Sequence, residues 1–518
     1  MSLRTLSDVK LAITQSEKEL FALAKKKLGK EPKYFEIKKK SLDARDKNAI
    51  KYVYTIAFSD ASQPPQKREL EKLPPLKMPE KPVLIAGAGP AGLFCALRLL
   101  ERGIKPVLVE RGAPVDEREQ SIQAFFKTRI LNVESNVQFG EGGAGTFSDG
   151  KLNTQTHSPL NREVLETFVR FGAPKEILWL QKPHIGSDNL KKVVKTMREF
   201  ILSQGGEIHF HTKLSDLEIK DDTLLSVTLK NVKTGETRKQ EISALSLAVG
   251  HSARDTFETL SKKGVAMRAK DFAVGVRIEH LQEKIGLSQY GKAYSMLPAA
   301  DYKLVSHASE RAVFTFCMCP GGYVMPATSE ENAVVTNGMS NYARNGKNAN
   351  AALIAQVRAE EFGGDFPLAG VEYQRKLERA AYIAGGNTYA APAQRVEDFL
   401  AGKESASFGE VLPTYAAGTT LCDLRAVLPK QVTDALKTAL PDMNGRLNGF
   451  AHPDALLTGV ETRTSSPLRI VRDEKTLQSL STKNLYPCGE GAGYAGGITS
   501  SAADGIRVAD AIFAHFSS

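Results

Sequence analysis

The sequence predicts an α/β protein, α+β overall, in which a domain built on a parallel sheet is interrupted by an inserted domain and preceded by a small α/β module. Three observations carry this prediction. They are a glycine-rich turn between two short apolar strands, a change after residue 270 to shorter predicted elements with long glycine- and alanine-rich connections, and a proline-rich segment near residue 70. The 518 residues also exceed what one hydrophobic core normally serves. We therefore expect the parallel-sheet domain at 82–270 and 456–518, the inserted domain at 271–455, the small module at 1–60 and a linker at 61–81.

The N-terminal module is predicted to be small and basic. An apolar face recurs at helical spacing within residues 16–29, and residues 34–38 and 51–58 favour strands because they are rich in aromatic and β-branched side chains. Residues 1–80 hold 18 Lys and Arg against 11 Asp and Glu, so most of the net charge of +10 lies in this part of the chain. Repeated prolines and charges without periodicity mark 61–81 as the linker.

The strongest pattern is a glycine-rich turn with the spacing GxGxxG. An apolar strand at 83–86 precedes it, a helix follows to Arg102, and a second strand at 106–109 ends on Glu110. In this setting the turn is typical of a Rossmann-like dinucleotide-binding unit, because its glycines let the backbone approach a pyrophosphate at the helix N-terminus. The terminal acid can accept hydrogen bonds from ribose hydroxyls. The candidate binding residues of this unit are Gly87, Ala88, Gly89, Pro90, Ala91, Gly92 and Glu110.

A second glycine-rich loop spans residues 138–154. Its glycines allow the backbone to lie against a flat or anionic ligand, although such a loop can also be a flexible turn. We expect Lys151 to neutralise negative charge on that ligand. The candidate binding residues of the loop are Gly142, Gly143, Ala144, Thr146 and Lys151.

The middle of the chain completes the first domain and begins the second. An amphipathic helix is predicted from Ser187 to the glycines at 205–206, and alternating segments after it indicate strands. The inserted domain is predicted from a mixture of shorter elements and long connections. Its expected strands are 272–278, 312–317 and 333–336, and its expected helices are 350–361 and 431–440.

The chain closes with another glycine-rich turn and a helix at 498–516. Gly491, Gly493 and Gly496 repeat the GxGxxG spacing. No strand follows the helix to supply a ribose-binding acid, so we reject a second dinucleotide-binding unit.

Together these pieces resemble the FAD-binding fold of glutathione-reductase-type flavoproteins. The resemblance implies that the first strand–helix–strand unit holds the ADP half of FAD, while the late strand and helix hold the ribitol and flavin, with Glu490 in place of the usual Asp. The closing helix would direct its positive N-terminus at the flavin and stabilise negative charge on the reduced ring. The resemblance adds as FAD-binding candidates Arg111, Leu214, Gly250, Gly489, Glu490, Gly497 and Ile498.

Five longer segments are similar to a bacterial group of uncharacterised FAD-dependent dehydrogenases, or NAD(P)/FAD-dependent oxidoreductases. This similarity implies an FAD-binding domain with an inserted substrate or cap domain, and it assigns no substrate. The segments are GEGGAGTFSDGKL (140–152), AVGHSARDT (248–256), FCMCPGG (316–322), ETRTSSPLRI (461–470) and YPCGEGAGYAGGITSSAADG (486–505).

We expect hydride transfer through flavin N5 between a transiently docked NAD(P)H and a small organic substrate. Cys317 and Cys319 are either a redox pair or buried packing. Arg463 either binds an anionic group or forms a structural ion pair. His251 and Arg254 either touch FAD or substrate or complete a turn. The sequence designates no catalytic acid or base.

The amino-acid composition excludes several classes of protein. With 42% apolar and 25% charged residues, the chain is neither disordered nor a coiled coil. The five scattered cysteines fit a reducing compartment, and His209 and His211 lack metal-ligand spacing with them, so we predict no metal site. We find no signal peptide or long apolar run, and we expect a cytoplasmic protein with no membrane partner.

Two alternatives remain beside the oxidoreductase. A tRNA-modifying flavoprotein could use the basic module, but a solvated lysine face explains the charge more simply, and we expect no nucleic-acid partner. The aromatic side chains available for base stacking there are Tyr34, Phe35, Tyr52 and Tyr54. The other alternative is a non-catalytic flavin-binding protein.

Overall fold

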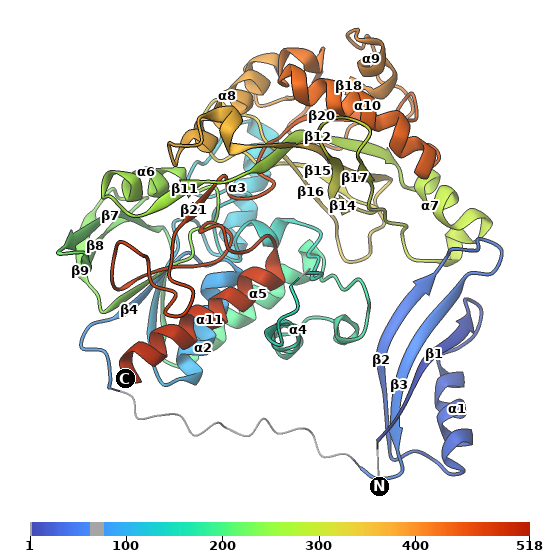
Figure 1. Ribbon diagram of the computed structural model, residues 1–518, viewed down its shortest axis with the longest axis horizontal. Helices are drawn as coiled ribbons and strands as arrows, with labels where there is room; N and C mark the ends of the chain where they lie inside the picture. The colour runs from blue at the N-terminus through green and yellow to red at the C-terminus, as the bar shows by residue number, and fades with distance from the viewer. Residues whose placement is uncertain (1–2, 63–76, 155, 518) are drawn as a thin grey trace.

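The computed structural model describes residues 3–62, 77–154 and 156–517. Figure 1 shows a large two-part body, with the N-terminal module standing to one side of it. Most of the segment predicted as a linker, 61–81, lies outside the described residues. None of the helices in the described ranges combines the length and the apolarity needed to cross a membrane.

The N-terminal module is a three-stranded antiparallel sheet covered by one helix. The strand order is β1-β3-β2, and α1 packs on the sheet through Leu20 and Ala24, which are fully buried. The helix ends at Gly29, whose φ of 73° is a conformation that favours glycine. The first strand is not predicted above, because most of its side chains are exposed and show no apolar alternation. The elements are β1 (Arg4–Ala12), α1 (Lys18–Leu28), β2 (Tyr34–Asp43) and β3 (Lys51–Ser59).

The FAD-type domain is built on a five-stranded parallel sheet with the order β22-β10-β4-β5-β6. The first and last helices of the domain, α2 and α11, cross closely on one face. A Cβ on Gly505 would lie 2.1 Å from the carbonyl oxygen of Ala91, so only glycine permits this crossing. The strands are β4 (Val83–Ala86), β5 (Pro106–Val109), β6 (Glu207–His209), β10 (Ala244–Leu247) and β22 (Leu485–Pro487), and the two helices are α2 (Pro90–Glu101) and α11 (Ile498–Ser517).

Separate apolar cores form on the two faces of this sheet. Helices α2, α4, α5 and α11 fill one core, and a three-stranded sheet with helix α6 fills the other. The predicted helix from Ser187 is confirmed as α5. The remaining elements of the domain are α3 (Val115–Thr128), α4 (Leu160–Arg170), α5 (Ser187–Ser203), β7 (Thr212–Lys220), β8 (Thr223–Asn231), β9 (Thr237–Glu241), α6 (Arg254–Lys262), β11 (Met267–Ala269) and β21 (Leu468–Ile470).

The inserted region forms a seven-stranded sheet with the order β13-β14-β17-β12-β20-β18-β19. It includes β20, which lies just past the boundary predicted at residue 455, because β20 pairs with β12 and β18. Helices α8, α9 and α10 lie over it in Figure 1. Its elements are β12 (Phe272–Leu281), α7 (Gln282–Tyr290), β13 (Val305–Ser306), β14 (Val313–Cys319), β15 (Tyr323–Pro326), β16 (Thr336–Met339), β17 (Asn348–Val357), α8 (Ala369–Ala384), β18 (Ala391–Arg395), α9 (Val396–Ala401), β19 (Thr419–Leu421), α10 (Lys430–Arg446) and β20 (Leu456–Glu461).

Two sequence predictions in this region are wrong. Residues 350–361 were expected to form a helix, but most of them belong to β17, which lies between β12 and β14 and is buried on both faces. Its alanines favour a helix locally, and their small size suits a central strand packed from both sides. The strand expected at 333–336 begins only at Thr336, as β16.

Candidate FAD site

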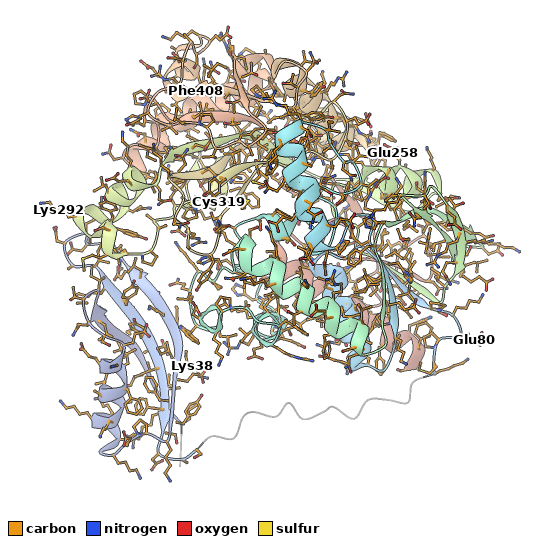
Figure 2. All side chains as sticks on the ribbon, turned by 180° about the vertical axis from the view of Figure 1, so that it is seen from behind. Lys38, Glu80, Glu258, Lys292, Cys319 and Phe408 are labelled. Atoms are coloured by element: carbon orange, nitrogen blue, oxygen red, sulfur yellow. The ribbon has the colours of Figure 1, made fainter. Side chains whose placement is uncertain are left out.

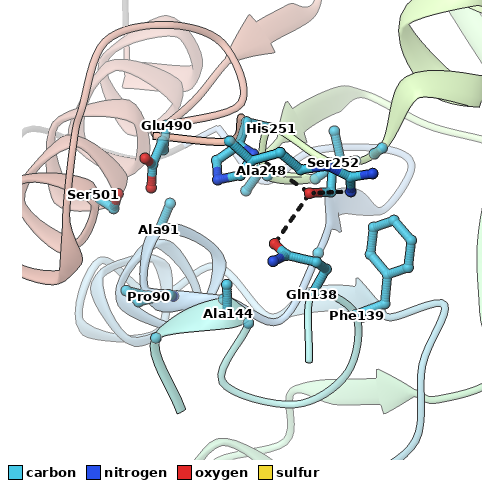
Figure 3. Close-up of a pocket in the computed structure, with 18 of the residues that line it drawn as sticks. Pro90, Ala91, Gln138, Phe139, Ala144, Ala248, His251, Ser252, Glu490 and Ser501 are labelled. Atoms are coloured by element: carbon cyan, nitrogen blue, oxygen red, sulfur yellow. Dashed lines mark hydrogen bonds between the residues drawn. The ribbon is translucent and has the colours of Figure 1, made fainter. Parts of the chain in front are cut away.

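A cavity of about 320 Å³ lies between the parallel sheet and the inserted domain. It runs along the carboxyl ends of β4 and β5, which is where open α/β sheets bind ligands, and it extends beneath β14 and β20. Figure 3 shows its floor, formed by Pro90, Ala91 and Ala144, and its opposite wall, formed by Ala248, His251 and Ser252.

Two glycine-rich turns meet at one end of this cavity. Gly87 has a φ of 107°, and a Cβ on it would lie 2.4 Å from the carbonyl oxygen of Ala248. Gly89 and Gly143 face each other so closely that a Cβ on Gly143 would lie 3.1 Å from the Cα of Gly89. Helix α2 begins directly after this turn, so its N-terminal N–H groups point toward the cavity. The arrangement fits a pyrophosphate.

Glu110 joins three loops at this end. Its carboxylate accepts hydrogen bonds from the backbone N–H groups of Ala88 (2.8 Å), Gly112 (2.9 Å) and Gly140 (2.9 Å). The residue also lines the cavity. Because a carboxylate has about four acceptor sites, it can order these loops and still accept a hydrogen bond from a ribose hydroxyl.

Arg111 is held in place beside Glu110. It pairs with Glu134 (2.7 Å) and with both carboxylate oxygens of Asp255 (2.9 Å each), and its guanidinium lies 4.2 Å from the ring centroid of Phe139. Its charge is therefore already matched by protein carboxylates, and Arg111 and Phe139 together supply a rigid wall of the cavity.

The other end of the cavity is bounded by the start of α11. A Cβ added to Gly496 or Gly497 would meet nothing within 4 Å, so the backbone there faces open space. Glu490 points into the cavity near Ser501 (Figure 3), and no described residue donates a hydrogen bond to its carboxylate. Burial raises the pKa of Glu490 to about 7, although Lys270 opposes the shift. The carboxylate is available to accept hydrogen bonds from a polyhydroxyl chain such as ribitol.

Gln138 provides a direct test of whether a ligand fits here. Its Oε1 accepts a hydrogen bond from Ser252 Oγ (3.0 Å), as Figure 3 shows. Its Nε2 is buried at the cavity wall and has no hydrogen-bond partner among the described residues. A buried donor without a partner is costly, so a ligand acceptor at this position completes the site.

Two buried arginine–glutamate clusters lie beside the cavity. In the first, which we name the closed cluster, Glu378 of α8 is held between Arg254 and Arg463. Arg254 donates to Glu378 at 2.7 and 2.8 Å, and Arg463 donates to it at 2.8 and 3.0 Å. Burial disfavours the charge of Glu378, but the two guanidinium groups more than offset this and hold its pKa well below the usual range.

The contacts of the closed cluster decide between the two roles predicted for Arg463 and the two predicted for Arg254. Arg463 lines the cavity, but its remaining donor goes to Ser252 (3.1 Å) and Ser329 (2.5 Å), so it is a structural ion pair. Arg254 does not line the cavity, so of its two predicted roles the structural one agrees with the structure. His251 does line it, and burial together with the two neighbouring arginines lowers the pKa of His251 to about 3. We infer that His251 is neutral.

The second cluster, which we name the open cluster, centres on Arg277 of β12. The guanidinium is fully buried and donates to Glu461 Oε1 (3.2 Å), to Asn350 Oδ1 (2.7 Å) and to the carbonyl oxygen of Cys317 (2.8 Å). Glu461 also accepts from Thr336 Oγ1 (3.3 Å) and lines the cavity. Burial raises the pKa of Glu461 to about 7, even though Arg277 opposes the shift.

The structure places most of the predicted site residues on one cavity. Those that line it are Gly87, Gly89, Pro90, Ala91, Glu110, Arg111, Gly143, Ala144, Lys151, Leu214, Gly250, Glu490, Gly497 and Ile498. Five others lie behind its wall, where they shape the turns: Ala88, Gly92, Gly142, Thr146 and Gly489.

Sequence reasoning missed Gln138, Asp149, Arg277 and the role of Glu461. The signal for Arg277 was present, because β12 begins as an apolar run from Phe272 to Val276 and Arg277 is the charged residue that ends it. Nothing in the sequence indicated that Glu461 would become its partner, since the two residues are 184 positions apart.

Comparisons with known proteins identify the family. Residues 271–464 match a family described as FAD-dependent protein, C-terminal domain-like, and residues 80–134 match a family described as FAD binding domain. Residues 4–59 match a domain of unknown function. An uncharacterized protein of Clostridium beijerinckii is 45% identical over 502 residues, which cover 93% of this chain and 92% of the relative. The chain belongs to this family of FAD-dependent proteins.

FAD is therefore the cofactor, as the sequence predicts, and the fold is of the FAD-binding Rossmann type. Solved structures of FAD-type proteins are similar to the chain only at low identity and low TM-score. A geranylgeranyl bacteriochlorophyll reductase-like protein of Thermoplasma acidophilum is 9% identical with a TM-score of 0.37, covering 85% of this chain and 80% of its own. A glycerol-3-phosphate dehydrogenase of Bacillus halodurans in complex with FAD is 12% identical with a TM-score of 0.36, covering 85% of this chain and 64% of its own.

Proposed function

We propose that this FAD-dependent protein is an oxidoreductase that transfers hydride between NAD(P)H and a small organic substrate bound beneath the inserted domain. Bound FAD supplies two-electron chemistry at its N5 position. The observation that carries the proposal is the composition of the cavity lining. One cavity is lined both by the N-terminus of α11 and by a buried carboxyl group of the inserted domain, Glu461.

Glu461 is the group best suited to move a proton in this reaction. It lines the cavity, and its pKa of about 7 places it between its two protonation states near neutral pH. A general acid or base works best when its pKa lies close to the working pH. The hydrogen bonds from Arg277 and Thr336 fix the orientation of the carboxyl group.

The N-terminus of α11 contributes a second effect. Gly497 and Ile498 line the cavity, so the positive end of a helix of 20 residues points at the bound group. This favours a ligand edge that becomes negative on reduction. It supports the proposal that the cavity serves two-electron reduction.

Anaerobic mixing with a nicotinamide tests the proposal. The FAD-loaded protein is mixed with NADH or NADPH, and the flavin absorbance is followed in a stopped-flow instrument. We expect bleaching with one of the two donors. Absence of bleaching with both donors overturns the assignment of a nicotinamide as the electron donor. Turnover of an acceptor above the background of free FAD eliminates the alternative of a non-catalytic flavin-binding protein.

The module structure argues against the tRNA alternative. Tyr54 is 2% exposed and donates a hydrogen bond to Glu17 (3.0 Å), and Phe35 packs edge-to-face on Phe21 with ring centroids 5.4 Å apart. The ring of Tyr52 is covered by Lys40, whose Nζ lies 4.6 Å from its centroid. These rings are already used inside the module. Salt-dependent retention on immobilised RNA, lost on removal of residues 1–80, would reverse this conclusion.

A further inference from the structure

An irregular strand turns one cysteine toward the cavity. The pairing of β14 with β17 shifts register between Phe316 and Cys319, and Cys317 lies within this bulge with a φ of 42°. Such a backbone conformation is unfavourable for a residue other than glycine and persists only where the surroundings impose it. Here Arg277 donates to the Cys317 carbonyl oxygen at 2.8 Å, and the Cys319 thiol donates to it at 3.2 Å.

The two sulfur atoms occupy different environments. Cys317 lines the cavity and is half-buried, whereas Cys319 is fully buried behind it. Figure 2 places Cys319 where the inserted domain meets the rest of the body. The Cys319 thiol, which donates to the Cys317 carbonyl oxygen at 3.2 Å, lies beside the residue that lines the cavity. Cys317 is therefore accessible from the cavity, and Cys319 is buried behind it.

Two cations converge on this pair. Arg277 Nη2 lies 3.6 Å from Cys319 Sγ, and Lys151 Nζ donates a hydrogen bond to the carbonyl oxygen of Met318. Asp149 pairs with Lys151 at 3.3 Å and holds it in position. Lys151 lines the cavity as the sequence predicts, and its nearest partners are these protein groups.

These contacts give the two thiols opposite acidities. The hydrogen bond from Cys319, followed by the charges of Lys151 and Arg277, lowers the pKa of Cys317 to about 5, although burial opposes the shift. Cys319 is the hydrogen-bond donor and lies next to that thiolate, so its pKa is raised. A thiolate beside a protonated thiol is the reduced form of a dithiol that can close to a disulfide.

The other three cysteines show the contrast. Burial raises the pKa of Cys95 to about 12 and that of Cys422 to about 11, and it raises the pKa of Cys488 as well. Cys95 and Cys488 belong to the apolar core of the FAD-type domain. Their thiols are inert packing, so the reactive character is confined to the pair at the cavity.

We propose that Cys317 and Cys319 are a dithiol–disulfide pair that exchanges two electrons with FAD and delivers them to a disulfide substrate. This inference rests on the proposed function and names its substrate class. It assigns to the sequence FCMC a chemical role in which the sulfur that lines the cavity attacks and the buried sulfur resolves.

The electrons and protons balance over two half-reactions. In the first, the Cys317–Cys319 disulfide accepts two electrons from reduced FAD. The S–S bond breaks, Cys319 takes up one proton and Cys317 is released as a thiolate. In the second, Cys317 attacks one sulfur of a substrate disulfide, a mixed disulfide forms and one substrate thiolate leaves. Cys319 then loses its proton to that thiolate and attacks Cys317 Sγ. The second substrate thiolate leaves, and a proton from Glu461 or water converts it to the thiol.

A reductive titration of the FAD-loaded full chain tests the pair. The protein is first oxidised in air and then titrated anaerobically with dithionite while the flavin absorbance is followed. We expect wild type to consume twice as many reducing equivalents per flavin as Cys317→Ser, because the variant has no disulfide to reduce. Cys422→Ser is the matched control and should behave as wild type. Equal consumption by wild type and Cys317→Ser would overturn the proposal.

A thiol count on wild type needs no variant and covers the case in which Cys317→Ser fails to fold or to bind FAD. The protein is denatured before and after reduction, alkylated, and digested for mass spectrometry. We expect the peptide containing residues 317–319 to gain two alkyl groups on reduction. The peptide containing Cys422 should be alkylated equally in both states. Full alkylation of Cys317 and Cys319 before reduction would refute the disulfide.

The two proposals fail in distinguishable ways. If NAD(P)H bleaches the flavin but the thiol count never changes, the cysteine pair is refuted and the oxidoreductase stands. If dithionite opens the disulfide but neither nicotinamide reduces the flavin, the pair stands and the electron donor is wrong.

Discussion

The closed cluster and the open cluster are built from the same residue types at the same cavity, yet they hold their charges differently. Arg463 of the closed cluster and Glu461 of the open cluster are two positions apart in the chain. In the closed cluster Arg254 and Arg463 both donate to Glu378, Glu330 adds a second carboxylate beside Arg254, and the pKa of Glu378 is lowered. In the open cluster one arginine is shared between Glu461, an amide and a carbonyl group, and the pKa of Glu461 is raised to about 7.

The difference teaches how a buried carboxyl group becomes either a structural or a titratable element. Charge balance and complete hydrogen bonding fix Glu378 in one protonation state. Incomplete compensation leaves Glu461 able to gain or lose a proton near neutral pH. Distance from the cavity does not explain the difference in pKa between the two clusters, because Arg463 and Glu461 both line the cavity.

The largest expected effect comes from breaking the closed cluster. Glu378→Gln removes the carboxylate to which both Arg254 and Arg463 donate, so Arg463 loses its close ion pair and the two guanidinium groups are left to share Glu330. Breaking a buried ion pair in this way is expected to lower the free energy of unfolding at neutral pH by about 3–5 kcal/mol. Denaturant unfolding measures this. Because the pKa of Glu378 is lowered in the folded state, its stabilising effect is lost as the pH falls below its ordinary value of 4.5, so the cost of the substitution should shrink there.

Glu372→Gln is the control for that experiment, since Glu372 is exposed on the same helix. It should leave the free energy of unfolding nearly unchanged. A similar loss in both variants would mean that α8 tolerates no substitution and that the cluster is not the cause.

In the open cluster, replacing the glutamate by glutamine should change the free energy of unfolding in the opposite direction. The folded-state pKa of Glu461 lies above its ordinary value of 4.5, so the folded protein binds this proton more tightly and loses stability as the pH rises from 4.5 to about 7. At about pH 8 we expect Glu461→Gln to be more stable than wild type by up to about 3 kcal/mol, and at about pH 5 to be equal to it.

Unfolding curves at the two pH values check this difference. Glu404→Gln, at an exposed position of the inserted domain, should follow wild type at both. A Glu461→Gln variant less stable than wild type at the higher pH would show that the ion pair with Arg277 outweighs burial.

Glu461→Gln should also slow catalysis. If this carboxyl group moves a proton, we expect the rate of flavin reduction or of reoxidation by substrate to fall about 100-fold. The wild-type rate should show an inflection near pH 7 that the variant lacks. Stopped-flow measurements across pH test this. An unchanged inflection in the variant would assign it to another group.

The smallest expected effect concerns cofactor affinity. Glu490→Ala removes a carboxylate that faces the cavity without a protein partner among the described residues. Loss of a hydrogen bond to a charged group costs about 1.5–3 kcal/mol, so FAD should bind at least about 10-fold more weakly. Equilibrium dialysis measures the affinity, and the exposed Glu474→Ala is the control. Unchanged binding would mean that Glu490 does not contact the cofactor.

Local patterns in the sequence were enough to predict the FAD-binding unit. The turn at Gly87, the helix after it and the acid at Glu110 lie within one short stretch, and each residue type has its own local physical reason. The same holds for α5 and α11, whose apolar faces recur at helical spacing.

The inserted domain and the reactive end of the cavity depend on contacts between distant residues. The alanines of β17 favour a helix in isolation, and only the strands on both sides make the segment a strand. The sequence alone leaves Cys317 open between a redox role and buried packing. The choice requires Arg277 and Lys151, which reach it from other elements, and no spacing in the sequence places them there.

The close crossing of α2 and α11 has a consequence for biosynthesis. The ribosome produces the Gly87 turn early, but Glu490 and the first turn of α11 emerge only after the whole inserted domain. The nascent FAD-type domain therefore waits with the sheet edge at β10 unpaired and one face of α2 uncovered. Firm retention of FAD becomes possible only when the last strand and helix arrive, so cofactor content reports on whether folding has reached completion.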